Sequence, residues 1–274
     1  MSTAASPDSM RVAAVQTVSG SDVQANLAAV EPLIIAAREQ GAMLVLLPEY
    51  FGIFGARATD KVDAREPDGH GIQQDFLCRI AREQRVWLIG GTVPIATDDP
   101  ARVRSASLVF DPQGRRVARY DKIHLFAFSQ GDERYDEAKT IECGQAPASF
   151  DSPFGRVGLS VCYDLRFPEL YRSYRDLALI VVPSAFTAVT GAAHWHVLLK
   201  ARAIENQCYV LAAAQGGKHP NGRRTYGHSL LIDPWGTVVA ELAEGAGVIV
   251  GDIDPSRLAQ VRRDLPALSH RRLR

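Results

Sequence analysis

A strand–turn–strand unit that occurs twice is the feature that most constrains how this chain folds. Residues 107–118 read SLVFDPQGRRVA and residues 229–240 read SLLIDPWGTVVA, so the unit returns after 122 positions, from Ser107 to Ser229. The segment Asp-Pro-x-Gly between two apolar runs is a hairpin signal, because proline and glycine favour the backbone angles of tight turns. No linker rich in Pro, Gly or Ser separates the two copies. The repeat therefore predicts a single domain of two similar halves with internal pseudo-two-fold symmetry.

Short apolar runs alternate with helical patterns in both halves. Helices are predicted at residues 23–37, 72–85, 168–175 and 192–207. Buried strands are predicted at residues 11–16, 43–47, 86–93, 157–162, 179–183 and 209–214. This alternation favours an α/β fold in which two sheets pack face to face and helices cover their outer faces, a four-layer α-β-β-α sandwich. Within the strand at 86–93, Gly90 and Gly91 mark a place where another group approaches the backbone closely.

The first ten residues lack the apolar run and basic flank of a targeting signal. Residues 1–10 are small and polar, so we expect a disordered N-terminal segment before a single domain over residues 11–274. Residues 255–274 begin as a helix and end in a basic tail that either frays or docks on a neighbouring subunit. No apolar run approaches the roughly 20 residues needed to cross a bilayer. These patterns predict a soluble, cytoplasmic protein.

Charge and cysteine content exclude several classes of partner. The chain has 31 basic and 31 acidic residues, so no overall field attracts nucleic acid or a membrane surface. Its four cysteines are too few for a disulfide framework and none form a CxxC pair, while its seven histidines lack metal-ligand spacing. We therefore expect no metal and no cofactor.

Three reactive side chains follow predicted strands. Cys162 ends the strand at 157–162, Glu49 follows the apolar run MLVLLP, and Lys122 ends the second strand of the first hairpin. A thiol nucleophile needs a base and a group that stabilises the oxyanion, and Glu49 and Lys122 stand where catalytic groups tend to lie. The alternatives are a solvated strand edge for each of the two charges and a buried core position for Cys162. A cysteine–histidine pair remains open, with four candidate histidines: His124, His194, His196 and His228. Of the other cysteines, Cys78 and Cys208 fit positions in the core. Cys143 has no sequence context that supports a role.

Taken together, the three segments resemble the nitrilase superfamily of carbon–nitrogen hydrolases. They are LLPEY with Glu49, YDKIHLF with Lys122 and SVCYDLRFPELYR with Cys162, separated by 73 and 40 residues. The resemblance runs from about Arg11 to Arg272. It implies a Glu–Lys–Cys triad in which Glu49 is the general base, Lys122 stabilises negative charge and Cys162 forms a thioester with the acyl group.

The resemblance also implies further site residues. A second active-site glutamate is expected between the lysine and cysteine segments, and Glu137 in YDEAKTIECG matches it better than the competing Glu133. The backbone N–H of Tyr163 is expected to donate to the oxyanion. The substrate's acyl carboxylate is assigned to Arg166, with the alternative that Arg166 pairs with Asp164 or Glu169. Two further residues are expected to line the acyl pocket, Phe186 and Thr187.

The resemblance points to an amidase branch, because Tyr163-Asp164 follows the nucleophile where nitrile-cleaving members have Trp-Glu. The implied substrate is a small-molecule amide of 2-oxoglutarate, either its amide with the dipeptide Cys-Gly or the simple amide 2-oxoglutaramate. Other aliphatic or N-carbamoyl amidases, and a non-enzymatic interaction protein on the same scaffold, are the alternatives. A homodimer or homotetramer is implied as well, formed through the helices beside the nucleophile strand.

Overall fold

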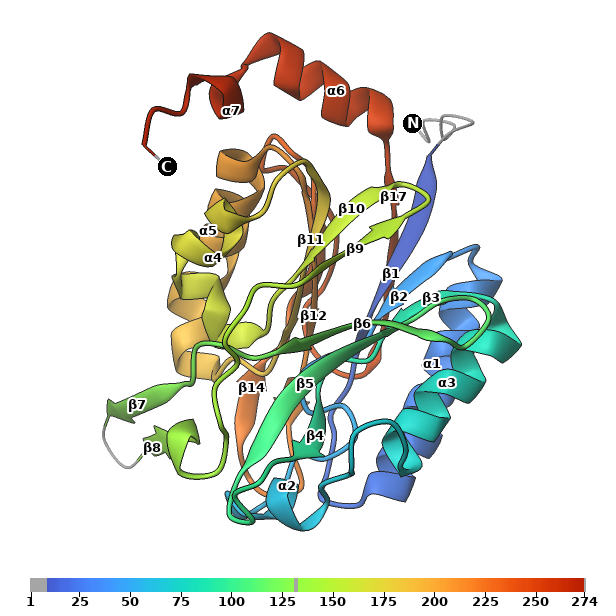
Figure 1. Cartoon of the computed structure of the whole chain (residues 1–274), viewed down its shortest axis with the longest axis vertical. Helices are drawn as coiled ribbons and strands as arrows, with labels where there is room; N and C mark the ends of the chain where they lie inside the picture. The colour runs from blue at the N-terminus through green and yellow to red at the C-terminus, as the bar shows by residue number, and fades with distance from the viewer. Residues whose placement is uncertain (1–8, 131–132, 274) are drawn as a thin grey trace.

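Two β-sheets pack face to face in the computed structural model, which describes residues 9–130 and 133–273 (Figure 1). The first sheet contains, in spatial order, β17 (Gly247–Ile253), β1 (Met10–Gln16), β2 (Leu44–Leu46), β3 (Trp87–Ile89), β5 (Val103–Phe110) and β4 (Val93–Ala96), with β6 (Arg116–Asp121) also paired to β5. The second contains β16 (Val238–Leu242), β15 (Ser229–Ile232), β12 (Tyr209–Ala214), β11 (Leu177–Ser184), β10 (Gly155–Leu159) and β9 (Ser149–Ser152).

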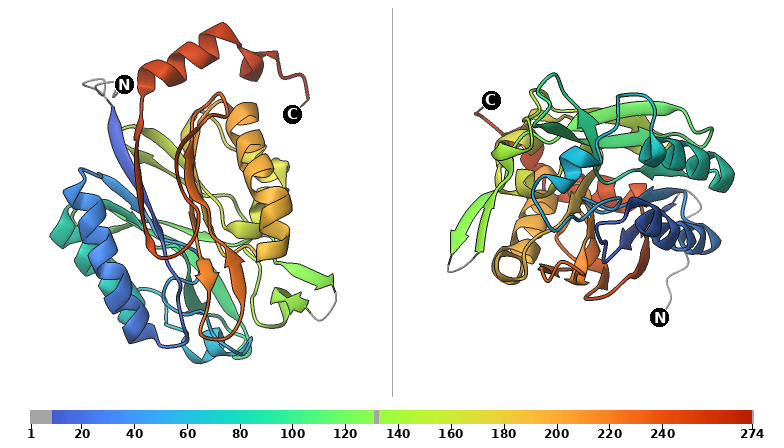
Figure 2. Two further views of the ribbon diagram at one scale, coloured as in Figure 1. Left: turned by 180° about the vertical axis from the view of Figure 1, so that it is seen from behind. Right: turned by 90° about the horizontal axis from the view of Figure 1, so that it is seen from below.

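Helices cover the outer face of each sheet. On the first sheet, α1 (Val23–Glu39) contacts β1 and β17, and α3 (Ile72–Gln84) contacts β3 and β5. On the second, α5 (Ala188–Asn206) contacts β12 and β15, and α4 (Pro168–Ser173) packs beside it. Figure 2 shows the two helical layers on opposite sides of the paired sheets. The expected four-layer α-β-β-α sandwich is confirmed.

The side chains of β1 show why its sequence reads as one continuous apolar run. Val12 and Ala14 belong to the hydrophobic cluster between the two sheets, whereas Ala13 and Val15 pack with residues of α1 and α3. All four are fully buried. Strands covered on both faces lose the polar–apolar alternation of a half-exposed strand.

The repeated sequence unit forms equivalent hairpins in the two sheets, β5–β6 and β15–β16. In each turn one aspartate, Asp111 or Asp233, accepts the backbone N–H groups two and four residues later at 2.8 to 3.0 Å. The turn glycines, Gly114 and Gly236, have positive φ angles of 79° and 89°. Both hairpins shift register one residue before the aspartate. The expected pseudo-two-fold symmetry is confirmed.

Several predicted boundaries differ from the observed ones. Helix α5 begins at Ala188 instead of residue 192, because the Thr187 side chain caps it by accepting the N–H of Thr190. Strand β1 begins at Met10, inside the N-terminal segment expected to be disordered; residues 1–8 of that segment lie outside the described residues.

The C-terminal segment docks on its own chain. Helix α6 (Pro255–Asp264) lies across one end of the sandwich (Figure 1), where Arg262 donates to the carbonyl of Leu177 at 2.6 Å. The short α7 (Ala267–His270) that follows is exposed. Among the described residues, no helix combines the length and apolar character needed to span a membrane.

Candidate active site

Glu49 is held by a tight backbone segment that follows β2. The Pro48 carbonyl oxygen approaches Gly91 so closely that a Cβ there would lie 1.9 Å from it, and Gly91 has a φ of 43°. The close approach expected at this glycine pair is confirmed. After Glu49 the chain turns at Tyr50, with a φ of 59°, and the Tyr50 N–H donates to Thr92 Oγ1 at 2.9 Å. Glu49 is consequently buried, with 1% of its surface exposed.

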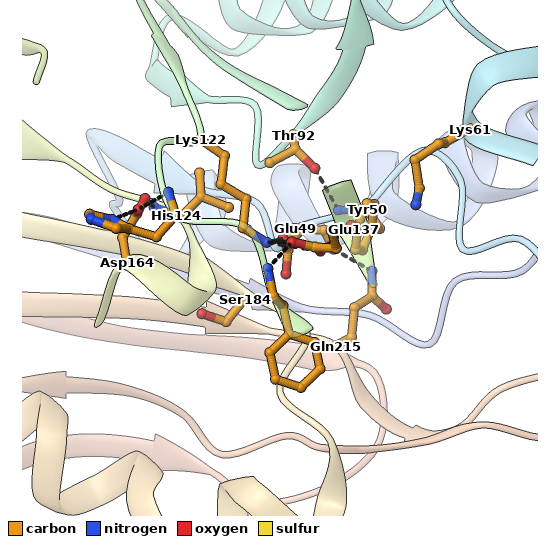
Figure 3. Close-up of polar contacts among 12 residues, drawn as sticks. Glu49, Tyr50, Lys61, Thr92, Lys122, His124, Glu137, Asp164, Ser184 and Gln215 are labelled. Carbon is orange, nitrogen blue, oxygen red and sulfur yellow. Dashed lines mark hydrogen bonds and ion pairs between the residues drawn. The ribbon is translucent and has the colours of Figure 1, made fainter. Parts of the chain in front are cut away.

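Lys122 joins two carboxylates inside the molecule. It follows β6, and its backbone N–H donates to the Ser105 carbonyl at 3.0 Å. Its Nζ donates to Glu49 Oε1 at 2.8 Å and to both carboxylate oxygens of Glu137 at 2.9 and 2.7 Å (Figure 3). The side chain is fully buried. The ammonium is therefore fixed between two carboxylates that approach it from different segments.

Glu137 occupies the position expected of the second glutamate. It begins the short helix η1 (Glu137–Lys139), accepts the Phe126 N–H at 2.7 Å and accepts the Tyr50 hydroxyl at 2.7 Å. Its alternative role, a loop salt bridge with Lys139 or Arg134, is not what the structure contains, because the carboxylate binds Lys122. Glu133, the competing residue, begins β8 (Glu133–Asp136), and its side chain lies outside the described part of the chain.

Cys162 lies in a sharp turn just beyond β10, so the strand ends earlier than the sequence predicted. It is the first residue of the short helix η2 (Cys162–Arg166) and has a φ of 49°, a region that side chains rarely adopt without support. Asp164 supplies that support: its Oδ2 accepts the Val161 N–H at 2.8 Å and the Tyr120 hydroxyl at 2.7 Å. Asp164 is fully buried, so the turn is anchored from within.

Cys162 and Glu49 line the same hollow. Burial raises the pKa of Cys162 well above its usual value, and the negative charge of Glu49 raises it further. Lys122 and the backbone N–H of Ala185 act in the opposite direction. The resting nucleophile is therefore a protonated thiol, and the Glu49 carboxylate in the same hollow is the candidate acceptor of its proton.

The pKa values of the three ionisable groups in this cluster, Glu49, Glu137 and Lys122, shift for different reasons. Burial raises the pKa of Glu49, and the neighbouring Glu137 raises it too, against the lowering effect of Lys122. Burial would also raise the pKa of Glu137, but Lys122 and three hydrogen bonds hold it below its usual value. The two carboxylates hold the pKa of Lys122 well above its ordinary value despite burial. Because the two carboxyl pKa values shift in opposite directions, Lys122 and Glu137 form a charged pair, and Glu49 is the carboxylate that can exchange protons.

The candidate histidines are engaged away from the thiol. His124 stacks on Phe167 and pairs with Asp164 at 2.7 Å. His194 contacts Arg166 at 3.1 Å. The structure thus favours Glu49 over histidine as the base for Cys162. The remaining cysteines are free: Cys208 is buried, Cys143 is exposed and Cys78 is half-buried, so Cys78 is less of a core residue than expected.

Two connected hollows meet at Cys162. The larger, about 900 Å³ including its open mouth, also contains Glu49, Tyr50 and Glu137 in its wall. The smaller, about 210 Å³, contains the four residues expected to bind substrate: Tyr163, Arg166, Phe186 and Thr187.

The Arg166 side chain is placed by aromatic neighbours. Its guanidinium lies over the ring of Tyr163 at 5.6 Å and over that of Phe186 at 5.3 Å. Asp164, one of its two alternative partners, is occupied by Tyr120 and His124.

Sequence reasoning missed several residues of this site. Tyr50 follows Glu49 in the segment LLPEY, but its place in the sequence does not predict the hydrogen bond that its hydroxyl donates to Glu137. Ala185, Lys61 and Arg223 also line the larger hollow. They lie on the segment after β11, on the short helix α2 (Asp60–Asp63) and beside β14 (Arg224–Tyr226), and no motif connects these segments.

One group of potential metal ligands lies outside this site. His196 and His228 both hydrogen-bond to Glu241 Oε1, at 2.8 and 2.5 Å, and the ligand atoms of all three residues lie within 4.8 Å of one another. The shared hydrogen bonds already satisfy this cluster. Beside Cys162, the Lys122 ammonium binds the carboxylates of Glu49 and Glu137, a set of groups that suggests nucleophilic chemistry at the thiol.

Comparison with known proteins agrees with this geometry. Residues 11–263 match the carbon-nitrogen hydrolase family model. The deaminated glutathione amidase of Synechocystis sp. is 42% identical over 94% of this chain and 97% of its own length. The crystal structure of the C. elegans NitFhit protein superposes with a TM-score of 0.89 at 39% identity, covering 96% of this chain, which spans 65% of that longer chain. Saccharomyces cerevisiae Nit3, a nitrilase-superfamily member, superposes with a TM-score of 0.86 at 30% identity over 98% of this chain and all of its own. This chain belongs to the carbon-nitrogen hydrolase family.

Proposed function

We propose that the chain hydrolyses a small linear amide through a thioester on Cys162, with Glu49 and Lys122 completing the catalytic triad. The observation that carries this proposal is the buried contact of Lys122 Nζ with Glu49 and Glu137, two carboxylates that line the same hollow as Cys162. Removing these charged groups from water costs free energy, and buried charges of this kind are typical of active sites.

In the first half of the reaction, Glu49 accepts the thiol proton as the sulfur attacks the amide carbon. The oxyanion receives hydrogen bonds from Lys122 Nζ and the backbone N–H of Tyr163. Protonated Glu49 then gives its proton to the leaving nitrogen, the C–N bond breaks and an amine departs. Proton transfer of this kind contributes about 10²–10⁴-fold in rate and an oxyanion donor about 10²–10³-fold.

In the second half, Glu49 takes a proton from water, whose oxygen attacks the thioester carbon. The C–S bond breaks, the acid leaves, and the proton returns to the sulfur of Cys162. Glu137 acts as a positioning residue, because its bonds to Lys122 and Tyr50 fix the ammonium in this reaction path.

The proposed substrate is deaminated glutathione, in which 2-oxoglutarate is joined to Cys-Gly by an amide bond. Support comes from the relatives that carry this activity in their name and from Arg166, which lies in the wall of the smaller hollow beside Cys162. A guanidinium at that place suits the carboxylate of the acyl group. Phe186 and Thr187 line the same hollow.

Release of 2-oxoglutarate tests this proposal. The purified protein is incubated with deaminated glutathione and, separately, with 2-oxoglutaramate, with Cys162→Ser as the control. A kcat/KM far higher for the peptide supports the proposal. The reverse ranking identifies an ω-amidase instead. If neither compound is turned over while a thiol reagent still alkylates Cys162, the chain is an aliphatic or N-carbamoyl amidase with another substrate.

We further propose that residues 11–274 act as one domain that assembles as a homodimer or homotetramer in the cytoplasm. Helix α5 exposes three apolar side chains: Val189, Val197 and Ile204. Exposed apolar residues on one helix suit contact with a second copy, and four free thiols suit a reducing compartment. Light scattering on Val197→Asp tests the assembly, because a charge there should favour the monomer if α5 forms the interface.

A further inference from the structure

Lys61 lines the larger hollow without a carboxylate partner among the residues that the structure describes. Its Nζ lies 3.4 Å from Thr140 Oγ1 and 5.5 Å from the centre of the Tyr50 ring. The two acidic residues of its own short helix, Asp60 and Asp63, bind Arg57 instead. Lys61 therefore lines the cavity as an ammonium that forms no ion pair with any described residue.

Arg223 presents a second such charge to the same cavity. Its guanidinium lies 5.7 Å from the centre of the Phe54 ring and 5.0 Å from that of Tyr135, and the described residues give it no ion pair. The next residue, Arg224, lines the cavity too but binds Glu244 at 2.8 Å. Adjacent arginines in one wall thus differ in whether a carboxylate of the chain neutralises them.

Lys61 and Arg223 lie close enough to one another and to Lys122 for their charges to interact. Burial lowers the pKa of Lys61, and repulsion from Lys122 and Arg223 lowers it further, against the attraction of Glu137 and Glu49. In Figure 3, Lys61 and Lys122 lie on opposite sides of the group formed by Glu49, Tyr50 and Glu137. Cations held together in a partly buried wall destabilise the fold unless an anion binds between them.

The position of this wall relative to Cys162 indicates which part of a substrate reaches it. Arg166 lies in the smaller hollow, whereas Lys61 and Arg223 lie in the larger one, and Cys162 belongs to both. An amide whose carbonyl carbon contacts the sulfur extends its acyl group into one hollow and its amine into the other. Arg166 assigns the acyl carboxylate to the smaller hollow, which leaves the larger one for the amine.

We propose that Lys61 and Arg223 bind a carboxylate on the leaving amine of the scissile amide. This inference rests on the proposed hydrolysis at Cys162 and gives its substrate class: amides of a short peptide or amino acid with a free C-terminal carboxylate. It predicts selection of the peptide over a simple amide whose leaving group is ammonia.

The test compares substrates that differ in that carboxylate alone. They are the 2-oxoglutaryl amide of Cys-Gly, the same molecule with its C-terminus amidated, and 2-oxoglutaramate. Amidation should lower the kcat/KM of the wild-type chain by about 10- to 100-fold, the effect of a charge-assisted hydrogen bond. In Lys61→Met, the kcat/KM for the free acid should fall to that for its amide, while the kcat/KM for 2-oxoglutaramate should stay within about twofold of the wild-type value.

Arg223→Gln should behave as Lys61→Met does, and the exposed Lys139→Met is the matched control that should leave all three substrates unchanged. A uniform loss on all three substrates in Lys61→Met would overturn the inference, as would a wild-type chain indifferent to amidation.

A binding measurement separates failure of the inference from failure of the proposed function. Cys-Gly and its C-terminal amide are titrated into Cys162→Ser, with and without Lys61→Met. Tighter binding of the free acid, lost in the Lys61 variant, supports the carboxylate site even if 2-oxoglutarate amides are not turned over. Equal binding of the free acid and the amide refutes the carboxylate site even if 2-oxoglutarate amides are turned over.

Discussion

Replacing Lys122 by methionine is the perturbation that best tests how the active site is held together. The ammonium is fully buried and lies within 2.9 Å of one oxygen of Glu49 and both oxygens of Glu137. Methionine has a similar length, so the substitution removes the charge while leaving little empty space. What remains is a pair of neighbouring carboxylates, 1% and 12% exposed, without their cation.

The expected loss of unfolding free energy is about 3–5 kcal/mol at pH 8, the range measured when one partner of a buried ion pair is removed. The sign of its pH dependence follows from the two carboxylates. In the wild type, Lys122 holds the pKa of Glu137 below its usual value, so the pair stabilises the fold above the unfolded pKa of about 4.3 and loses that contribution in acid. In the variant, burial raises the pKa of both carboxyl groups without Lys122 to oppose it, so both values should lie above the unfolded value. The deficit is therefore greatest at high pH and shrinks as pH falls toward 5.

Urea unfolding followed by circular dichroism, at fixed protein concentration, measures this deficit at pH 8 and pH 5. Lys139→Met is the control; its side chain is 76% exposed and its partner lies 3.8 Å away, so it should cost less than about 0.5 kcal/mol. Adding Glu137→Gln to Lys122→Met should recover part of the stability, because it removes one of the unneutralised charges. A loss below about 1 kcal/mol at pH 8, or a deficit that grows in acid, refutes the assignment of a charged, mutually stabilising cluster.

Three further predictions concern the turns and charges around the site. Asp164→Asn should lower unfolding free energy by about 2–4 kcal/mol and reduce kcat, because Asp164 accepts bonds from Val161, Tyr120 and His124; an unchanged melting temperature would contradict this. Gly91→Ala should destabilise by more than about 1 kcal/mol, since its φ is positive and its Cβ would meet the Pro48 carbonyl; wild-type urea unfolding and kcat would show that Glu49 does not depend on this contact. The acid limb of the kcat/KM profile should lie above the ordinary glutamate pKa, because burial raises the pKa of Glu49, and Glu137→Gln should move that limb to lower pH by removing a charge that raises it; movement to higher pH would exclude Glu49 as the titrating base.

Local sequence signals were sufficient for most of the architecture. The Asp-Pro-x-Gly turns determine their hairpins through interactions within a few residues, with Asp111 and Asp233 capping the backbone and Gly114 and Gly236 supplying positive φ. Apolar runs of strand length identified most of the buried strands, and the repeat revealed the symmetry. The three reactive residues each follow a strand or hairpin that could be recognised, so their proximity followed from the family resemblance before any distance was known.

The details that decide the chemistry depend on contacts between distant segments. Which glutamate reaches Lys122 could not be read from the loop, because Glu137 is placed there by hydrogen bonds from Phe126 and from Tyr50, 87 residues away. The positive φ of Cys162 likewise depends on Asp164 and its bond to Tyr120.

The cationic wall of the larger hollow is the clearest case of a feature decided by tertiary structure alone. Lys61 comes from a four-residue helix and Arg223 from the segment before a three-residue strand, and neither segment has a periodicity that predicts its partners. The sequence by itself determined the sandwich, its repeat and the three reactive side chains, because those depend on short-range pattern. Folding decided which charges meet, which pKa values shift and which cations remain free for a substrate, because these depend on burial and on distances across the assembled core.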